Sequence, residues 1–363
     1  MLTIEMGDVS AMRAAKKSEE IRDFIINAIP GHHRDVVART TERFGLTRQA
    51  INRHMNILIK EGLVNAEGKT SQRIYKLPIL EKESITIPLK GLEEDRLWRE
   101  YVNESLKDLP ENVYNIWHYG FTEMVNNVID HSSGVMLTVT VGKTAATTNM
   151  MIKDDGVGIF RKIKTDLGLE DERHAILELA KGKLTTDPAR HTGEGIFFSS
   201  RMFDHFQILS GGIYFSHKID EEEDWILERD IPKEGTNVIM SINNKSNRTT
   251  KEIFDKFSSR KEDYGFTKTV VPVRLLKHGL EQLISRSQAK RLLARFERFK
   301  VVILDFAGVE EIGQAFADEV FRVFPGIHPE VKLIPVNITK DVRKVIKRAK
   351  FELSLPLFNN KDA

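Results

Sequence analysis

The feature that most constrains this chain is a short segment near its middle, EMVNNVIDHS at residues 123–132. Its apolar residues recur at helical spacing, which predicts a helix with one buried face. Glu123, Asn127 and His131 fall at every fourth position, so they share another face of the same helix. A carboxylate, an amide and an imidazole on one face are either a solvated surface or part of a site for a metal-bound nucleotide.

Glycine and carboxylate motifs follow at the ends of further predicted elements. The alternation in VMLTVTVGKTAATTNMMIKDDGVGI, residues 135–159, predicts an antiparallel hairpin whose second strand ends at Asp154. Gly193-Glu194-Gly195 precedes an apolar helix, and Gly235-Thr236 precedes the strand NVIMSI. Each motif alone is common by chance. Their order along the chain is the informative observation.

This order of motifs resembles the GHKL ATPase superfamily, which includes gyrase B subunits, sensor histidine kinases and mismatch-repair ATPases. The resemblance covers roughly residues 110–245. Within the superfamily the chain looks most like the stand-alone anti-sigma-factor serine kinases, which also lack a dimerisation-phosphoacceptor helix pair. The resemblance implies a Bergerat-type α/β sandwich over residues 96–250 that binds ATP and Mg²⁺. The alternative is a degenerate fold of this type that no longer binds ATP.

The resemblance also implies roles for single residues. Asn127 would supply an oxygen to Mg²⁺, an ion that keeps most of its water and needs few protein ligands. Glu123 would orient or deprotonate a water or hydroxyl near the terminal phosphate. Asp154 is the expected acceptor for the adenine amino group, and Gly156 and Gly158 leave room for the base.

Further residues of the same motifs are expected around the phosphates and the base. Gly193 and Gly195 would let backbone N–H groups and the following helix N-terminus meet the phosphates. Thr236 would add a hydroxyl near the adenine. His131 has two interpretations, contact with the nucleotide or packing at the helix end.

A polar segment before Gly193 would form a mobile lid over the nucleotide. Its basic residues are Lys181, Lys183 and Arg190. One of them is expected near the terminal phosphate, and Lys183 is the candidate among the cofactor-binding residues.

The N-terminal residues 14–80 predict a winged helix-turn-helix domain. Helical patterns at residues 19–29 and 35–44 are followed by Thr47, a plausible N-cap, and by a third helix at residues 48–62. Two short strands around a polar turn then complete the pattern. Because residues 13–77 contain 13 Lys or Arg against 7 Asp or Glu, double-stranded DNA is the expected partner.

Polar side chains on the outer side of the third helix and in the wing are the candidates for DNA contact. They are Arg48, Gln49, Asn52, Arg53, Lys69 and Arg73. The alternative is a winged helix that binds only another protein.

Two connecting segments flank the central domain. Residues 81–95 are predicted to be a linker or an edge strand, and residues 251–263 a helical connector. Strands and helices then alternate over residues 264–355, which implies a small α/β domain with a mixed sheet.

The run LDFAGVEEIGQAFADEVF in this last domain resembles the STAS domains of anti-sigma-factor antagonists, and more closely the STAS-like domain fused to such ATPases. Phosphorylated STAS proteins carry Ser or Thr after the loop isoleucine, but Ile312 is followed by Gly313, Gln314 and Ala315. The usual phosphate acceptor is therefore absent here, and a hydroxyl elsewhere, such as that of Ser285 or Ser287, is the alternative. The resemblance implies a protein partner for this domain.

The composition excludes several classes of site. The chain contains no cysteine, which removes disulfides, thiolate metal sites and cysteine nucleophiles. No apolar run approaches the roughly 18 residues of a membrane span, and the N-terminus lacks a secretory signal pattern. We therefore expect a cytoplasmic protein without membrane contact.

We therefore interpret the chain as a DNA-binding transcriptional switch controlled by Mg-ATP. The alternative is a protein serine kinase that acts on a separate STAS partner. Slow ATP hydrolysis by a clamp-like homodimer is a third alternative.

Overall fold

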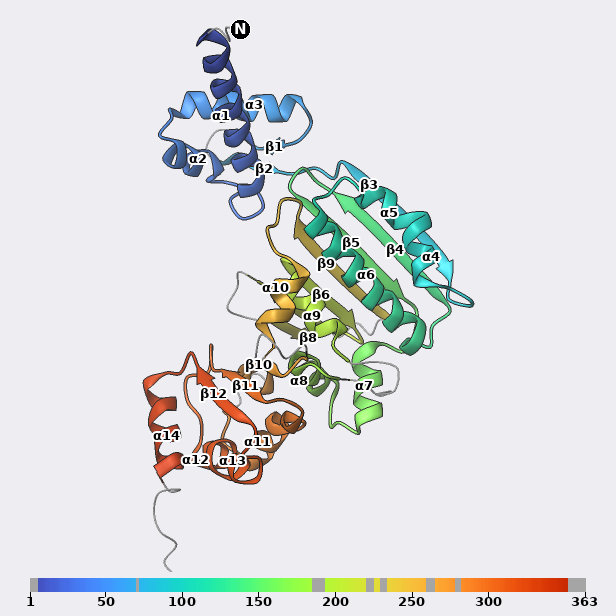
Figure 1. Cartoon of the computed structure of the whole chain (residues 1–363), viewed down its shortest axis with the longest axis vertical. Helices are drawn as coiled ribbons and strands as arrows, with labels where there is room; N and C mark the ends of the chain where they lie inside the picture. Colours follow the sequence, from blue (N-terminus) through green and yellow to red (C-terminus); the bar gives the residue numbers. More distant parts are fainter. Residues whose placement is uncertain are drawn as a thin grey trace, which may run out of the picture. The chain divides into compact units, whose positions relative to one another are not determined.

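The computed structural model describes residues 6–69, 72–184, 193–219, 225–228, 234–258, 265–277 and 282–351 (Figure 1). The chain divides into two compact units. The first unit comprises Met1–Ile85, Val139–Met150 and Ser241–Ser246. The second comprises Thr86–Thr138, Met151–Met240 and Asn247–Ala363.

The first unit begins with three helices and two short strands in the order that the sequence predicts, although the first helix begins at Met6 and not at residue 19. They are α1 (Met6–Ala28), α2 (Val36–Phe44), α3 (Arg48–Lys60), β1 (Asn65–Glu67) and β2 (Ile74–Lys76). Gly45 ends α2 in the left-handed conformation, and the Thr47 side chain caps α3 by accepting a hydrogen bond from the Ala50 N–H. Strands β1 and β2 pair antiparallel.

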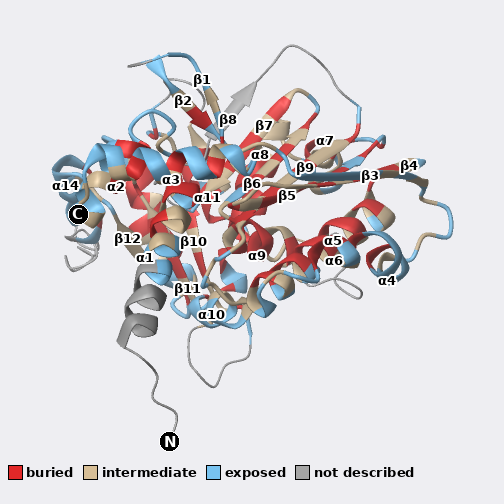
Figure 2. Cartoon of the chain, turned by 90° about the horizontal axis from the view of Figure 1, so that it is seen from above, coloured by how far each residue is buried: buried red, intermediate tan, exposed pale blue. Residues whose placement is uncertain are grey.

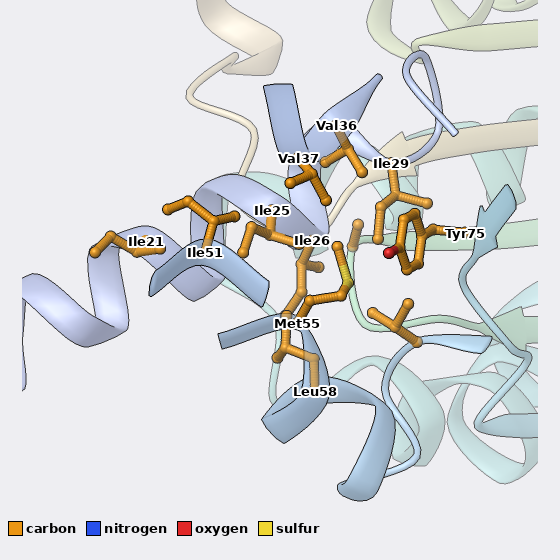
Figure 3. Close-up of a cluster of buried hydrophobic side chains, with 12 residues drawn as sticks. Ile21, Ile25, Ile26, Ile29, Val36, Val37, Ile51, Met55, Leu58 and Tyr75 are labelled. Atoms are coloured by element: carbon orange, nitrogen blue, oxygen red, sulfur yellow. The ribbon is translucent and has the colours of Figure 1, made fainter. Parts of the chain in front are cut away.

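A single apolar core joins these helices (Figure 3). Its buried members are Ile21, Ile25, Ile26, Ile29, Val36, Val37, Ile51, Met55, Leu58, Val64, Tyr75 and Ala146. Ala146 comes from a distant part of the sequence, so the helices are completed by the segment Val139–Met150 of the same unit. Asn243 Nδ2 donates to Asn27 Oδ1 at 2.7 Å and Lys245 pairs with Asp23 at 2.6 Å, which adds polar contacts.

A seven-stranded sheet forms the centre of the chain, in the order β3-β4-β5-β9-β6-β7-β8. Its strands are β3 (Glu81–Pro88), β4 (Met136–Lys143), β5 (Thr147–Asp154), β6 (His205–Ser210), β7 (Ile213–Lys218), β8 (Trp225–Glu228) and β9 (Thr236–Asn243). Residues 81–88, predicted as part of a linker or as an edge strand, form the edge strand β3. Buried and half-buried residues alternate along β4 and β5, because successive side chains point to opposite faces.

Helices α6 and α9 lie next to each other on one face of this sheet (Figure 2). The helical elements here are α4 (Glu94–Leu97), η2 (Trp98–Val102), α5 (Asn103–Leu106), α6 (Glu111–His131), α7 (Ile159–Leu167), α8 (Glu172–Lys181), α9 (Gly195–Met202) and α10 (Thr250–Lys256). Gly120 permits close packing of α6, since a Cβ there would lie 2.5 Å from the Phe203 ring and 3.3 Å from the Met240 sulfur.

The C-terminal region is described over residues 265–277 and 282–351, and these residues contain three parallel strands in the order β10-β11-β12. Its elements are β10 (Lys268–Pro272), η3 (Val273–Leu276), α11 (Arg286–Leu293), η4 (Phe296–Arg298), β11 (Val301–Asp305), α12 (Gln314–Asp318), η5 (Glu319–Val323), α13 (Phe324–Ile327), β12 (Lys332–Val336) and α14 (Lys340–Phe351). The expected mixed sheet is therefore wrong for the strands described: helical crossovers separate them, and such connections join parallel strands.

Among the residues that the structure describes, none of the helices has the length and apolar character needed to cross a membrane.

The core of the first unit makes a specific prediction about α3. Ile51→Ala should lower the free energy of unfolding of this unit by about 2–5 kcal/mol, because Ile51 is completely buried and the truncation leaves a cavity. Ile57→Ala, on the outer side of the same helix at 40% exposure, is the matched control and should change it by less than about 0.5 kcal/mol. Hydrogen exchange of the α3 amides measures both, and equal effects would contradict the assigned core.

Candidate functional site

A cavity of about 300 Å³ lies in the second unit, lined by residues of α6, α7, α9, β9 and the end of α8. Seven of the residues predicted from the sequence line it: Glu123, Asn127, Asp154, Gly158, Gly193, Gly195 and Thr236. They are separated by up to 113 positions along the chain (236 − 123), and the fold brings them together. The volume is within the range of small-molecule sites.

Helix α6 contributes the polar face recognised in the sequence. Glu123, Asn127 and His131 all line the cavity. Met124 and Val125 of the same helix are buried in the core. Since the apolar face fixes the rotation of α6, the polar residues at every fourth position are turned toward the cavity.

The carboxylate of Asp154, at the end of β5, is held by backbone donors. Asp154 is 3% exposed, and its Oδ1 accepts a hydrogen bond from the Gly156 N–H at 2.8 Å. Burial raises the pKa of Asp154, while backbone N–H groups of Gly156 and Thr236 act in the opposite direction. A desolvated carboxylate in a cavity binds strongly to a ligand N–H group.

The glycines of the site are required by close backbone approach. A Cβ on Gly156 would lie 2.1 Å from the Ser132 carbonyl oxygen, and one on Gly195 would lie 2.1 Å from Glu123 Oε2. Gly158 has a φ of +87°, which side chains rarely adopt. Gly156 does not line the cavity itself, but it holds Asp154 through its N–H.

The N-terminal end of α9 is acidic. The carboxylate of Glu123 lies against Gly195, the first residue of this helix, and Glu194 at the N-cap position also lines the cavity. Burial raises the pKa of Tyr119, and the charges of Glu123 and Glu194 raise it further. Glu194 was not predicted as a site residue, because only the two glycines of the Gly193-Glu194-Gly195 motif were assigned a role.

Lys183 lies outside the lining of the cavity. Its Nζ donates to the Arg298 carbonyl at 2.9 Å and stands 5.0 Å from the centre of the Phe299 ring. Burial lowers the pKa of Lys183. The neighbouring Leu184 lines the cavity instead. Arg190, the third predicted lid residue, is outside the described residues.

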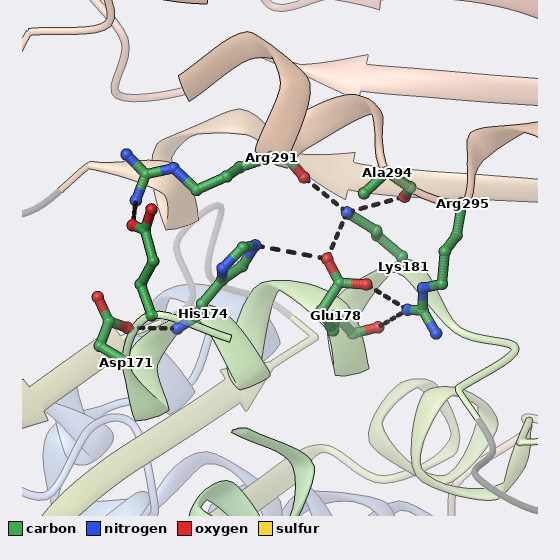
Figure 4. Close-up of polar contacts among 8 residues, drawn as sticks. Asp171, His174, Glu178, Lys181, Arg291, Ala294 and Arg295 are labelled. Carbon is green, nitrogen blue, oxygen red and sulfur yellow. Dashed lines mark hydrogen bonds and ion pairs between the residues drawn. The ribbon is translucent and has the colours of Figure 1, made fainter. Parts of the chain in front are cut away.

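Lys181 is not a lid residue: it ends helix α8 and is completely buried (Figure 4). Its Nζ donates to Glu178 Oε1 at 2.6 Å and to the carbonyl oxygens of Arg291 and Ala294, each at 3.0 Å. Arg295 pairs with the other carboxylate oxygen of Glu178 at 2.5 Å. Desolvation lowers the pKa of Lys181 to about 8. The expectation of a mobile lysine was wrong: α8 is packed in the core through its apolar residues, and Lys181 at its end is buried with them.

The predicted DNA-binding residues are exposed in the first unit. Arg48, Gln49, Asn52 and Arg53 are exposed on α3, whose buried residues are Ile51, Met55 and Leu58. Lys69 and Arg73 are exposed in the segment between β1 and β2, apart from residues 70–71, which are not described. Their exposure agrees with the amphipathic pattern of α3, and DNA binding stays a prediction.

The loop before α12 contains no hydroxyl at the position expected for a phosphate acceptor. Gly313 is the N-cap residue of α12, and a Cβ on it would lie 2.7 Å from the Ile284 backbone. The hydroxyl of Ser285, a possible substitute in the sequence, caps α11 by accepting a hydrogen bond from the Gln288 N–H.

Residues 288–343 match the family model described as a STAS-like domain of unknown function (DUF4325). This match begins in α11, includes β11 and β12, and ends in α14. It confirms the STAS-like interpretation for these residues. No curated protein matches the chain. The resemblances of the N-terminal and central regions stay predictions.

The backbone approach at Gly156 makes a prediction that needs no ligand. Gly156→Ala should lower the free energy of unfolding of the second unit by about 1–3 kcal/mol, because the new methyl group would overlap the Ser132 carbonyl. Gly31→Ala, where no atom lies within 4 Å of the new Cβ, is the control and should have little effect. The fluorescence of Trp98 and Trp117, both in the second unit, follows unfolding. A neutral Gly156→Ala would show that the approach is not close.

Proposed function

We propose that this protein is a nucleotide-dependent regulator, in which the cavity of the second unit binds Mg-ATP and the N-terminal helices bind double-stranded DNA. The observation that carries the proposal is the convergence of Asp154 and Asn127, from β5 and α6, on one cavity. A buried carboxylate and a carboxamide are suited to the two chemically different ends of a nucleotide.

Asp154 supports recognition of adenine. Its carboxylate is desolvated and is anchored on one oxygen by Gly156, so it can accept a hydrogen bond from an exocyclic amino group. Gly158 and Thr236 line the same part of the cavity, and Thr236 Oγ1 accepts a hydrogen bond from the Ile159 N–H at 3.0 Å. This bond fixes the start of α7 beside the base site.

Asn127, Glu123 and the start of α9 support the binding of the phosphates. The carboxamide oxygen of Asn127 is a suitable single protein ligand for Mg²⁺, which takes its other ligands from phosphate and water. When bound, Mg²⁺ would neutralise phosphate charge beside the two carboxylates of Glu123 and Glu194. Glu123 can orient a water or hydroxyl by accepting a hydrogen bond from it, or can deprotonate it. The backbone N–H groups at Gly195 begin an eight-residue helix whose N-terminus attracts anions.

The exposed outer side of α3 supports DNA binding. Arg48, Asn52 and Arg53 offer donors to phosphates and base edges, while Ile51, Met55 and Leu58 fix the helix on its core. A three-helix arrangement followed by a two-stranded ribbon is a common architecture for such contacts.

Nucleotide binding should depend on the carboxylate of Asp154. Asp154→Asn keeps the size of the side chain but weakens the hydrogen bond to the adenine amine, so Mg-ATP should bind about 10- to 100-fold more weakly. Isothermal titration calorimetry measures the affinity of the full-length chain.

The adjacent Asp155→Asn is the matched control for this experiment. Asp155 does not line the cavity, and its Oδ1 accepts hydrogen bonds from the Val135 and Met136 N–H groups. An asparagine oxygen can accept the same bonds, so this variant should bind like the wild type. Absence of Mg-ATP binding by the wild type would reject the proposed site, and equal losses in both variants would reject the role of Asp154.

DNA binding should depend on the charge of α3. Arg53→Ala should weaken binding to mixed-sequence duplex DNA and reduce the slope of log affinity against log salt by about 1 if Arg53 contacts one phosphate. Lys60→Ala removes an equal charge from the C-terminal end of the same helix and serves as control. Fluorescence anisotropy at several salt concentrations measures both, and an unchanged affinity and salt slope for Arg53→Ala would exclude this face.

A further inference from the structure

Two chain segments that line the candidate nucleotide cavity also contact the C-terminal region. Leu179 and Leu184 line the cavity at the end of α8, and Gly195 and Phe197 line it at the start of α9. The backbone joins these segments directly, since the Leu184 N–H donates to the Gly193 carbonyl at 3.0 Å. The contacts that these two segments make with the C-terminal region therefore help to fix the position of the residues that line the cavity.

The end of α8 is fixed to the C-terminal region by its main chain and by a buried cation. Thr269 Oγ1, in β10, donates to the Lys181 carbonyl at 2.7 Å. Lys181 Nζ in turn donates to the carbonyls of Arg291 and Ala294, which end helix α11 (Figure 4). A cation at a helix C-terminus is favourable, because the last carbonyls have no partners within the helix.

A second polar contact lies two residues further along the chain. Arg298 Nη1 donates to the Lys183 carbonyl at 3.1 Å, and Lys183 Nζ donates to the Arg298 carbonyl at 2.9 Å. Lys183 has a φ of +52°, an uncommon backbone conformation for a residue with a side chain. The reciprocal pair stabilises this conformation directly before Leu184, a residue of the cavity wall.

The start of α9 contacts the same region through aromatic rings. The ring centres of Phe197 and Phe266 are 4.4 Å apart, and Phe266 also contacts Phe299 at 5.3 Å. Gly182 allows this packing, because a Cβ there would lie 2.6 Å from Phe266 and 2.9 Å from Phe197. Phe266 therefore supports α8 and α9 together.

We propose that the C-terminal region is part of the framework of the nucleotide site, with Phe266, Arg295 and Arg298 as positioning residues, so that nucleotide binding and the packing of this region on α8 and α9 are coupled. This inference rests on the proposed function of the cavity. The coupling suggests how the STAS-like segment would act on the site: a protein that binds this segment and loosens α11 would weaken nucleotide binding. By linkage, bound nucleotide would strengthen the packing of the C-terminal region on α8 and α9.

Hydrogen exchange of the full-length chain tests the coupling. The probe is Mg²⁺ with the non-hydrolysable ATP analogue AMP-PNP. Its addition should slow amide exchange at residues 296–300, none of which lines the cavity, as well as at residues 154–159 beside Asp154. Slower exchange at residues 154–159 alone would overturn the inference and leave the proposed function standing. No change at either place, with no measurable binding, would overturn both.

Variants at Arg298 separate positioning from general stability. Arg298→Ala removes the donor to the Lys183 carbonyl and should weaken AMP-PNP binding on the order of 5- to 20-fold. Arg298→Lys retains a donor and a charge and should restore binding. Arg348→Ala removes the same charge from an exposed position on α14 and should bind like the wild type.

Arg298 is preferred to Arg295 for this test, because removing Arg295 takes one of its ionic partners from the buried Glu178 carboxylate and endangers folding. If Arg298→Ala is folded by circular dichroism and binds AMP-PNP as tightly as the wild type, Arg298 does not position the site. A loss that Arg298→Lys fails to restore would also contradict the proposed role of its donor.

Discussion

The arrangement of the second unit depends on one buried cation, the Lys181 ammonium group. An isolated charge in an apolar interior costs several kcal/mol, so Lys181 is compatible with its place only because Glu178 and two carbonyls of α11 surround it. These partners come from two separate parts of the sequence. The same contacts therefore compensate the buried charge of Lys181 and join α8 to the C-terminal region. Any change that exposes one of these partners affects both the charge compensation and the connection.

The cavity depends on a different constraint, the close approach of backbone segments. Gly156 contacts Ser132 after α6, and Gly235 approaches the Asp154 carbonyl so closely that a Cβ would lie 2.0 Å from its oxygen. These contacts leave no space for side chains at Gly156 and Gly235, so the backbone on both sides packs closely around Asp154. Protein interiors are close-packed and deform little, and a desolvated carboxylate held in this way presents a fixed acceptor to a ligand.

The sequence predicted the parts of the site that depend on local periodicity. The polar face of α6 follows from residues at every fourth position, and Glu123, Asn127 and His131 indeed line one cavity. Asp154 is the last residue of β5 and Thr236 is the first residue of β9, and both line the cavity as well. The prediction for the lid lysines had no such basis. A lysine in a polar segment has the same local sequence whether it faces a ligand or a buried carbonyl, so Lys181 was wrongly assigned.

By itself, the sequence determined the elements whose pattern repeats within a few residues: the three N-terminal helices with their buried stripe, the strand that ends at Asp154, and the STAS-like segment at residues 288–343. Tertiary structure alone decided the contacts between residues more than 80 positions apart, such as Thr269 with Lys181 and Arg298 with Lys183. Helical and strand periodicity arises from backbone geometry and is visible locally. The partner of a buried charge or of a free carbonyl is selected by packing and desolvation over the whole fold, and no local pattern records that choice.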